Sequence, residues 1–247
     1  MKTTRKIKKQ NVLIAVIIIT LPLIIYICFN LSSIKTVSDG NIENFKAIDN
    51  RWEQKGRIKD ISNNIVIIIG DSRMEFLSDR GNSIEIPTNF SFIALGDTKI
   101  SWFNNQAVHI LKKSIDNNND INYHVILNMG VNDLNDSNDP LIHSENYFRI
   151  YKKLAQNYKD VNFYVLSVNP LDMSIINTKI YNQKRTNSKI EIFNDNMIKN
   201  INNSNLNNMH YCDSYHTVEF VTRDGLHYNK KTDQNIVNYL TNSCLNY

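Results

Sequence analysis

Residues 64–73 read Asn-Ile-Val-Ile-Ile-Ile-Gly-Asp-Ser-Arg, a solid aliphatic run followed at once by polar residues. The aliphatic part, residues 65–69, is too short for a helix and rich in β-branched side chains. It therefore predicts a β-strand that is buried on both faces. The polar residues after it would lie at the carboxyl end of that strand, with Ser72 in a turn before a helix. Glycine is scarce, with 7 in 247 residues, so Gly70 at the strand end indicates a special backbone position.

The rest of the domain alternates short β-like runs with segments whose apolar residues recur at helical spacing. Further strands are predicted at residues 90–95, 125–129, 161–168 and 209–213. Helical patterns lie at residues 103–111, 147–154, 190–201 and 236–240. This alternation predicts an α/β fold: a three-layer α/β/α sandwich around a parallel, flavodoxin-like sheet of five strands. Ligands of such sheets bind at the carboxyl ends of the strands, so the residues after each strand are the candidates for chemistry.

Four of these positions carry unusual polar residues. The first strand is followed by Gly70-Asp71-Ser72-Arg73, the second by Gly96-Asp97 and the third by Gly130-Val131-Asn132-Asp133. Before the last helical segment the chain reads Asp224-Gly225-Leu226-His227. Each piece alone is weak evidence, because such short motifs also occur in ordinary turns. Their order along the chain, with each piece at a strand end or in a loop, is far more specific.

Together these pieces resemble, in order, the four signature blocks of the SGNH/GDSL hydrolases, and the resemblance covers about residues 64–242. The stretches that look most like secreted bacterial members of that family are Ser72-Arg73, residues 131–134, residues 167–170 and residues 224–228. The resemblance implies an enzyme that hydrolyses ester bonds through a serine nucleophile.

The resemblance implies a catalytic triad of Ser72, Asp224 and His227, and the chemistry of these side chains supports it. An unassisted serine hydroxyl is a poor nucleophile, but His227 could take its proton and later return it to the leaving alcohol. Asp224, three residues earlier, could hold the other ring nitrogen. The same resemblance implies an oxyanion hole formed by the backbone N–H groups of Ser72 and Gly96 and by the side-chain amide of Asn132.

Each of these residues also has a simpler interpretation. Ser72 could only cap the following helix, His227 could be a surface residue, and the Asp224-Gly225 and Asn132-Asp133 pairs could be ordinary turns or caps. Three further residues are interpreted as structural supports of the loops: Asp71, Arg73 and Asp133.

The remaining polar motifs do not indicate a cofactor. Five histidines are interpreted as solvated or core residues: His109, His124, His143, His210 and His216. No histidine pair has metal-ligand spacing, so neither a metal nor another cofactor is expected. The chain has no G-x-S-x-G motif, which argues against an α/β-hydrolase fold.

The N-terminal part of the chain predicts a membrane anchor. Residues 12–29 carry no charge and are long enough to cross a bilayer as a helix. The basic residues before this run favour an N-terminus inside the cell and a domain outside it. We expect a single-pass protein of the cell membrane, with a cytoplasmic tail at 1–11, a transmembrane helix at 12–29, a tether with a short amphipathic helix at 30–60 and the hydrolase domain at 61–247. The alternative is a cleaved signal peptide, which would also export the domain.

The net positive charge of the chain belongs mainly to this N-terminal part. The formal net charge is +4, but residues 1–35 hold six Lys or Arg and no acid. The other residues carry 22 basic against 24 acidic side chains. A nucleic-acid interface would need a basic patch on the folded domain, so no nucleic-acid partner is expected.

Three other features of the sequence leave alternatives open. Cys212 and Cys244 could form a disulfide or remain two thiols. Residues 171–189 are polar and lack a clear period, which is compatible with a surface insertion that touches substrate. Polar residues that follow Ser72, Glu75 among them, leave the shape of the substrate pocket open.

The expected function is hydrolysis of carboxylic esters through an acyl-enzyme on Ser72. The expected substrate carries a short acyl group, such as acetyl, on a cell-envelope or extracellular glycan, because a tethered domain outside the membrane meets the envelope first. No feature indicates an oligomeric state. One alternative is an O-acyltransferase that passes the acyl group from Ser72 to a sugar hydroxyl. Another is a non-catalytic glycan-binding module on the same scaffold.

Overall fold

A parallel sheet of five strands forms the middle of the domain. The computed structural model describes residues 64–80, 83–116, 121–176 and 184–245. The strands are β1 (Asn64–Gly70), β2 (Phe90–Ala94), β3 (Asn122–Asn128), β4 (Asn162–Leu166) and β5 (Met209–Cys212). Their order across the sheet is β2-β1-β3-β4-β5, and every neighbouring pair is parallel. This confirms the predicted flavodoxin-like sheet.

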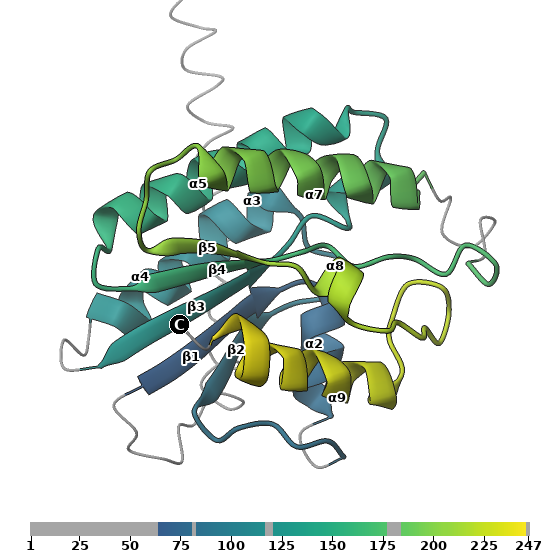
Figure 1. The fold of residues 1–247 in the computed structure, drawn as a ribbon, viewed down its shortest axis with the longest axis horizontal. Helices are drawn as coiled ribbons and strands as arrows, with labels where there is room; N and C mark the ends of the chain where they lie inside the picture. Colours follow the sequence, from purple (N-terminus) through teal and green to yellow (C-terminus); the bar gives the residue numbers. More distant parts are fainter. Residues whose placement is uncertain (1–63, 81–82, 117–120, 177–183, 246–247) are drawn as a thin grey trace, which may run out of the picture. The chain divides into compact units, whose positions relative to one another are not determined.

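Helices cover both faces of the sheet, so the domain has three layers (Figure 1). One face carries α2 (Ser72–Asp79) and α9 (Lys230–Tyr239), while the other carries α4 (Val108–Asp116), α5 (Pro140–Asn157) and α7 (Asn187–Asn202). The shorter elements are α3 (Ile100–Trp102), a π-helical turn (Phe103–Ala107), a 3-10 turn (Asp133–Asn135), α8 (Ser214–Thr217) and a second π-helical turn (Leu240–Cys244).

The core lies on both sides of β1, as the aliphatic run predicts. Residues 65–69 are at most 3% exposed. Because side chains alternate along a strand, successive residues of β1 face opposite layers. On the side of α2 and α9 the core includes Val66, Ile68, Met74, Leu77, Ile236 and Leu240. The opposite side holds a group of aromatic rings in mutual contact: Phe103, Tyr147, Tyr151 and Phe193.

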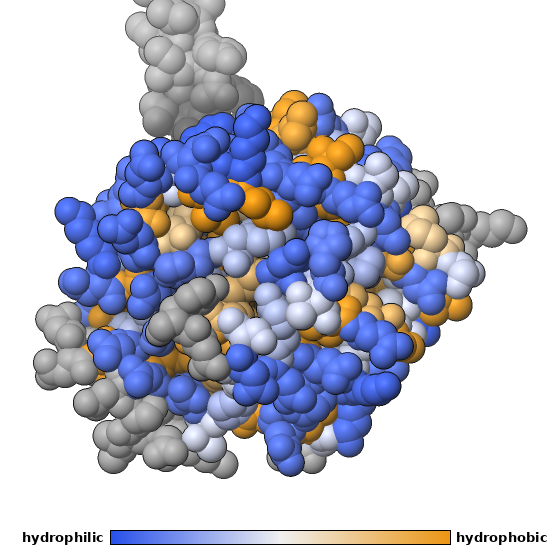
Figure 2. Space-filling model, viewed as in Figure 1, coloured by the Kyte–Doolittle hydropathy of each residue, from blue (hydrophilic) through white to orange (hydrophobic). Residues whose placement is uncertain are grey.

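The face of the domain seen in Figure 2 is mostly hydrophilic, with apolar side chains in small groups between polar ones. The large apolar side chains that are more than 40% exposed are Leu141, Ile142, Met173, Ile175, Ile192 and Val221. This polar surface is typical of a domain that faces water.

The strand order reverses beside β1, and this positions the functional loops. The chain runs from β1 to the edge strand β2 and then returns past β1 to β3. The connection after β1 leads to α2 on one face, whereas the connections after β2 and β3 lead to helices on the other face (Figure 1). A crevice forms at the carboxyl ends of strands where connections diverge in this way.

The fourth strand is shorter than predicted. The sequence pattern extends over residues 161–168, but β4 ends at Leu166. The backbone of Val168 bonds instead to the side chain of Asn194 in α7, which donates to its carbonyl at 2.9 Å and accepts from its N–H at 3.0 Å. A side-chain amide therefore replaces the next strand as the partner of Val168.

Cys212 and Cys244 form a disulfide that joins the end of β5 to the last helical turn. Of the two possibilities that the sequence left open, a disulfide or two thiols, the structure has the disulfide. The predicted segments 1–11, 12–29 and 30–60 lie outside the described residues. Within the described residues, no helix combines the length and the apolar character that crossing a membrane requires.

Candidate active site

Ser72 is held at the carboxyl end of β1 by the start of α2. Asp71 caps this helix, because its Oδ1 accepts a hydrogen bond from the N–H of Arg73 at 3.0 Å. Ser72 is the first residue of α2, so its own N–H belongs to the helix-terminal groups that have no partner within the helix. The sequence thus places a hydroxyl and a backbone donor together at the positive end of a helix.

Asp224 and His227 lie in a tight loop that reaches over this helix end. The Asp224 Oδ1 atom accepts from the backbone N–H of Leu226 at 3.0 Å and of His227 at 2.7 Å. Its Oδ2 atom is 2.7 Å from Nδ1 of His227, and Nε2 of His227 is 3.0 Å from Oγ of Ser72. The three residues that the sequence predicts as a triad therefore form one continuous hydrogen-bonded chain.

Gly225 allows this loop to turn. Its φ of +89° lies in the region that side chains with a Cβ rarely adopt. A Cβ on Gly225 would also lie 2.6 Å from the backbone N and Cα of Ile176, and the Gly225 carbonyl accepts from the N–H of Asp172 at 3.0 Å. The loop after β4 is thus packed directly against the Asp224–His227 loop.

The environment of Asp224 favours the carboxylate. Partial burial by itself raises its pKa, but the hydrogen bonds from the His227 ring and from two backbone N–H groups outweigh this and bring the pKa below the usual value. An ionised Asp224 can only accept, so it requires a hydrogen on Nδ1 of His227 and leaves Nε2 as the acceptor toward Ser72.

The His227 ring is also fixed by an aromatic contact. Phe76, one turn after Ser72 in α2, meets it edge-on with 4.7 Å between the ring centroids. The guanidinium of Arg223 lies 4.8 Å from the centroid of Phe76. The imidazole side chain is 14% exposed, so it is sheltered but reachable.

The predicted oxyanion-hole residues Gly96 and Asn132 lie in the loops after β2 and β3. A Cβ built on Gly96 would be 3.8 Å from Cβ of Ser72 and 2.9 Å from a carboxylate oxygen of Glu75. Asn132 follows β3, and its Nδ2 donates to the carbonyl of Thr98 at 3.0 Å. Gly96 is thus adjacent to Ser72, and Asn132 is tied to the loop that carries Gly96.

Solved structures share this arrangement of strands and helices. A Streptococcus pneumonia protein provisionally named a platelet activating factor matches with a TM-score of 0.60 and 15% identity, covering 85% of this chain and 96% of that one. A carbohydrate acetylesterase from Sinorhizobium meliloti matches with a TM-score of 0.53 and 11% identity, covering 72% and 98%. A member of the lipolytic G-D-S-L family from Veillonella parvula matches with a TM-score of 0.50 and 12% identity, covering 74% and 100%.

The chain has the SGNH/GDSL hydrolase fold. At these identities the likeness establishes the fold, and the roles of individual residues rest on the geometry described above. No family model matches the chain, and no curated protein matches it in sequence.

Arg73, in α2, joins this helix to two loops: the loop after β4 and the Asp224–His227 loop. The side chain is 3% exposed and donates to the carbonyls of Leu226 at 3.1 Å, Asn169 at 2.7 Å and Pro170 at 3.3 Å. Its guanidinium also lies 4.7 Å from the ring centroid of Tyr228. These contacts agree with the predicted role of Arg73 as a support of the loops, because they fix the Asp224–His227 loop relative to α2.

The two buried aspartates of the motifs also act as supports. Burial raises the pKa of Asp71, although the Arg73 charge and N–H, His227 and Arg185 oppose this. Asp133 accepts from the N–H of Ile100 at 3.2 Å and from the hydroxyl of Tyr147 at 2.7 Å. Asp133 therefore anchors the residue next to Asn132 to α3 and α5.

A second Asp-x-x-His pair in the chain has the same spacing but a different environment. Asp213 and His216 are also three residues apart and 2.8 Å from each other, but the His216 side chain is 70% exposed. Of the two pairs, the one at Asp224 and His227 reaches the hydroxyl of Ser72. Within the described residues no three His, Cys, Asp or Glu side chains gather in a way that could hold a metal ion.

Arg185 is the neighbour of the site that the sequence analysis did not identify. It lies in the predicted polar insertion, yet it is 6% exposed, and Leu171 and Ile176 of the same stretch are also buried. The described part of residues 171–189 is therefore not a plain surface insertion. The sequence carries no signal for this, because a single arginine in a polar stretch ordinarily lies in solvent.

Proposed function

We propose that this protein is a serine hydrolase that cleaves carboxylic esters, with Ser72 as nucleophile, His227 as general base and acid, and Asp224 as the residue that orients His227. The observation that carries this proposal is the unbroken chain of hydrogen bonds from Asp224 through His227 to Ser72. A serine hydroxyl becomes an effective nucleophile when a histidine accepts its proton in this way.

The reaction has two halves. In the first, Oγ of Ser72 attacks the ester carbonyl carbon while its proton passes to Nε2 of His227. The C–O bond to the alcohol then breaks, and the alcohol leaves with that proton. In the second, water attacks the acyl-enzyme, His227 takes a proton from the water, and the acid leaves as Ser72 regains its proton.

Each half passes through a tetrahedral intermediate with a negatively charged oxygen. The N–H groups of Ser72 and Gly96 and the amide of Asn132 are its proposed donors. Preorganised donors in a sheltered site stabilise such charge far better than bulk water does, and losing one typically costs about 100- to 1000-fold in rate.

The proposed substrate is a short acyl group, such as acetyl, on a cell-envelope or extracellular glycan. The similar structure of a carbohydrate acetylesterase supports this class. The Glu75 carboxylate against Gly96 supports a short acyl group, because a long apolar chain beside a carboxylate would be poorly accommodated.

The proposed location is the outer face of a membrane, with the N-terminus inside. The uncharged residues 12–29 and the basic residues before them support a single-pass anchor. The disulfide between Cys212 and Cys244 supports an oxidising compartment, because disulfides persist mainly outside the cytoplasm.

The test is hydrolysis of p-nitrophenyl esters from acetate to octanoate by the purified full-length protein and its Ser72→Ala variant. We expect turnover to be highest for the shortest esters and to fall by at least about a thousandfold in the variant. Ser78→Ala is the matched control, because Ser78 lies on the same helix and its hydroxyl bonds only to the helix backbone in the described structure.

The His227→Ala variant tests the proposed base. Its turnover should fall steeply, because Ser72 then lacks the acceptor for its proton. Wild-type turnover in His227→Ala would contradict that role. Equal rates for wild type and Ser72→Ala would contradict hydrolysis at Ser72, and product analysis with sugar acceptors would then test acyl transfer.

A further inference from the structure

Arg185 brings a buried positive charge to the proposed oxyanion hole. It precedes α7 in an extended stretch and contacts the loop after β3. Its Nε donates to the carbonyl of Val131 at 2.8 Å, and its Nη2 donates to Oδ1 of Asn132 at 2.8 Å. Both acceptors lie in the loop that supplies the proposed amide donor, so the guanidinium holds the backbone and the side chain of this loop together.

These contacts fix the direction in which the Asn132 amide points. Oδ1 accepts from Arg185, which has donors and no acceptor, so the two ends of the amide cannot exchange places. One hydrogen of Nδ2 is bound to the carbonyl of Thr98. Within the described part of the chain this is the bond that Nδ2 donates, and its second hydrogen remains for a substrate oxygen.

The position of Arg185 also suits electrostatic stabilisation. Its pKa is lowered by burial and by the nearby charge of Arg73, whereas Asp71 and Asp97 oppose this. Asp71 and Arg73 follow β1 on either side of Ser72, and Asp97 follows β2 next to Gly96. A buried cation interacts more strongly with a nearby anion than a solvated one does, because the local dielectric is low.

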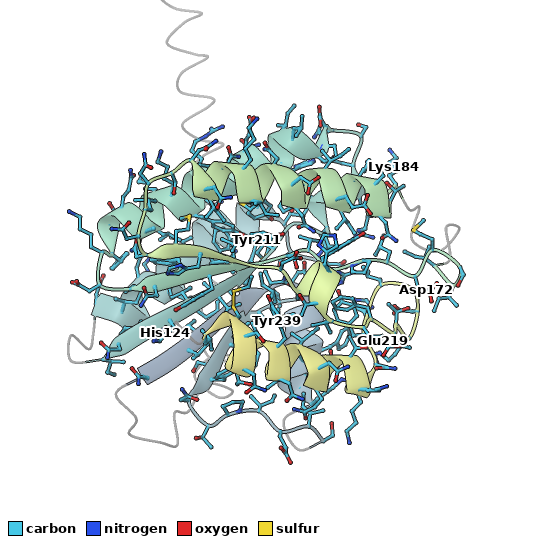
Figure 3. The ribbon with its side chains drawn as sticks, in the orientation of Figure 1. His124, Asp172, Lys184, Tyr211, Glu219 and Tyr239 are labelled. Atoms are coloured by element: carbon cyan, nitrogen blue, oxygen red, sulfur yellow. A yellow bond between two sulfur atoms is a disulfide. The ribbon has the colours of Figure 1, made fainter. Side chains whose placement is uncertain are left out.

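The neighbouring residue provides a contrast. Lys184 carries the same charge one position earlier, but its side chain is exposed and lies near the N-terminal end of α7 in Figure 3. Only its backbone N–H is fixed in the described structure, by Oδ1 of Asn135 at 2.8 Å. The two cations therefore differ in burial and in their contact with Asn132.

We infer that Arg185 is a positioning residue of the oxyanion hole, which orients the Asn132 amide toward the developing oxyanion and adds positive charge behind it. This inference rests on the proposed function, because it assigns Arg185 to the same reaction at Ser72. Arg185 acts through Asn132, and it stabilises the transition state more than the bound ester.

The alternative is that Arg185 only fastens the stretch before α7 to the loop after β3. A purely structural role predicts lower stability in the variants, with a loss of activity that does not depend on Asn132. A positioning role predicts a lower kcat with nearly unchanged KM, and a loss that requires the Asn132 side chain.

The experiment uses full-length Arg185→Met, Asn132→Ala and the double variant, with Lys184→Met as the matched control. For p-nitrophenyl acetate we expect kcat of Arg185→Met to fall about tenfold to a hundredfold with KM within about twofold, since the residue acts through one donor. In the Asn132→Ala background the same substitution should cost less than about twofold. Lys184→Met should match the wild type.

A second readout does not depend on the ester. A fluorophosphonate probe labels Ser72 when Oγ bonds to phosphorus, the P–F bond breaks, fluoride leaves and the serine proton passes to His227. The labelling rate should fall in Arg185→Met in parallel with kcat, because the phosphoryl oxygen of the probe binds the same oxyanion-hole donors as the ester oxygen. If the wild type is labelled at Ser72 but hydrolyses no ester, the proposed substrate is wrong while the inference on Arg185 is still tested.

Arg185→Lys covers the case in which the methionine variant does not fold. Lysine keeps the charge, but its single ammonium group cannot donate to the Val131 carbonyl and Asn132 Oδ1 in the geometry of a planar guanidinium. The labelling rate of Arg185→Lys should therefore lie between those of wild type and Arg185→Met. Equal losses from Arg185 substitution with and without Asn132, or a change confined to KM, would overturn the inference.

Discussion

At the residue scale, the proposed chemistry depends on how His227 is held. Its Nδ1 faces Oδ2 of Asp224 and its Nε2 faces Oγ of Ser72, so the two nitrogens have different tasks. The other oxygen of Asp224 accepts two backbone N–H groups, and the pKa of this carboxyl is lowered by its hydrogen bonds. The carboxylate thus keeps its place independently of the ring and sets the tautomer of the ring.

Asp224→Asn should separate these two tasks. The asparagine oxygen can still accept the backbone N–H groups, so the loop should keep its shape. Its NH₂ group cannot accept from Nδ1, so His227 would adopt the wrong tautomer and kcat should fall by about 10³–10⁴-fold. Steady-state ester hydrolysis measures this, with Asp213→Asn as control because it alters the exposed Asp213–His216 pair. Wild-type activity in Asp224→Asn would contradict the orienting role of Asp224.

At the scale of the elements, a buried ion pair joins α2 to α9. Arg80, at the end of α2, pairs with Asp233 in the first turn of α9 and also donates to the carbonyl of Tyr228 at 3.2 Å. Asp233 is 1% exposed. Burial raises its pKa to about 6, although the charges of Arg80 and Arg223 oppose this. The pair therefore connects the helix that begins at Ser72 with the last helix, at a cost in desolvation.

The sign of its pH dependence follows from that raised pKa. The folded protein binds the Asp233 proton more tightly than the unfolded chain, so this group contributes stability below its ordinary pKa of 3.8 and loses that contribution as the pH rises through about 6. The free energy of unfolding of wild type relative to Asp233→Asn should therefore decrease between about pH 4 and 7.

Urea denaturation of both proteins across this range tests the expectation. Asp160→Asn, which removes an exposed carboxylate, controls for the change in net charge. A difference that grows in favour of wild type as the pH rises would mean that attraction to Arg80 outweighs the burial of Asp233.

At the scale of the whole domain, the disulfide closes the segment that carries two of the three residues of the proposed triad. Cys212 and Cys244 are 32 residues apart, and the segment between them carries both Asp224 and His227. Closing a segment of this length restricts the unfolded chain and typically stabilises a fold by about 2–4 kcal/mol. The contacts of Arg73 with the Leu226 carbonyl and the Tyr228 ring hold the same segment against α2 without the disulfide.

The Cys212→Ala, Cys244→Ala double variant should therefore unfold more easily by about 2–4 kcal/mol and keep its kcat while folded. Denaturant unfolding measures the first quantity and ester hydrolysis at low temperature the second. Adding reductant to wild type under partly denaturing conditions should reproduce the loss. If wild type and the variant are equally stable, the disulfide does not contribute in the protein as isolated.

The sequence by itself determined the features that depend on neighbouring residues. The aliphatic run 65–69 predicted a strand that is buried on both faces. The alternation of strand-like runs with segments of helical spacing predicted the parallel sheet. The short spacing of Asp224 and His227 predicted that their side chains would pair. Such features could be inferred because strand and helix periodicities and tight loops are local.

The tertiary structure decided the features that join distant parts of the chain. It brought Arg73 to Leu226 across 153 positions and Arg185 to Asn132 across 53, and it paired Cys212 with Cys244. No local pattern marks these residues, because a buried cation is stable only where remote carbonyls and amides converge on it. The sequence therefore predicted the residues of the proposed triad and oxyanion hole, whereas the groups that hold these residues in place became visible only in the folded chain.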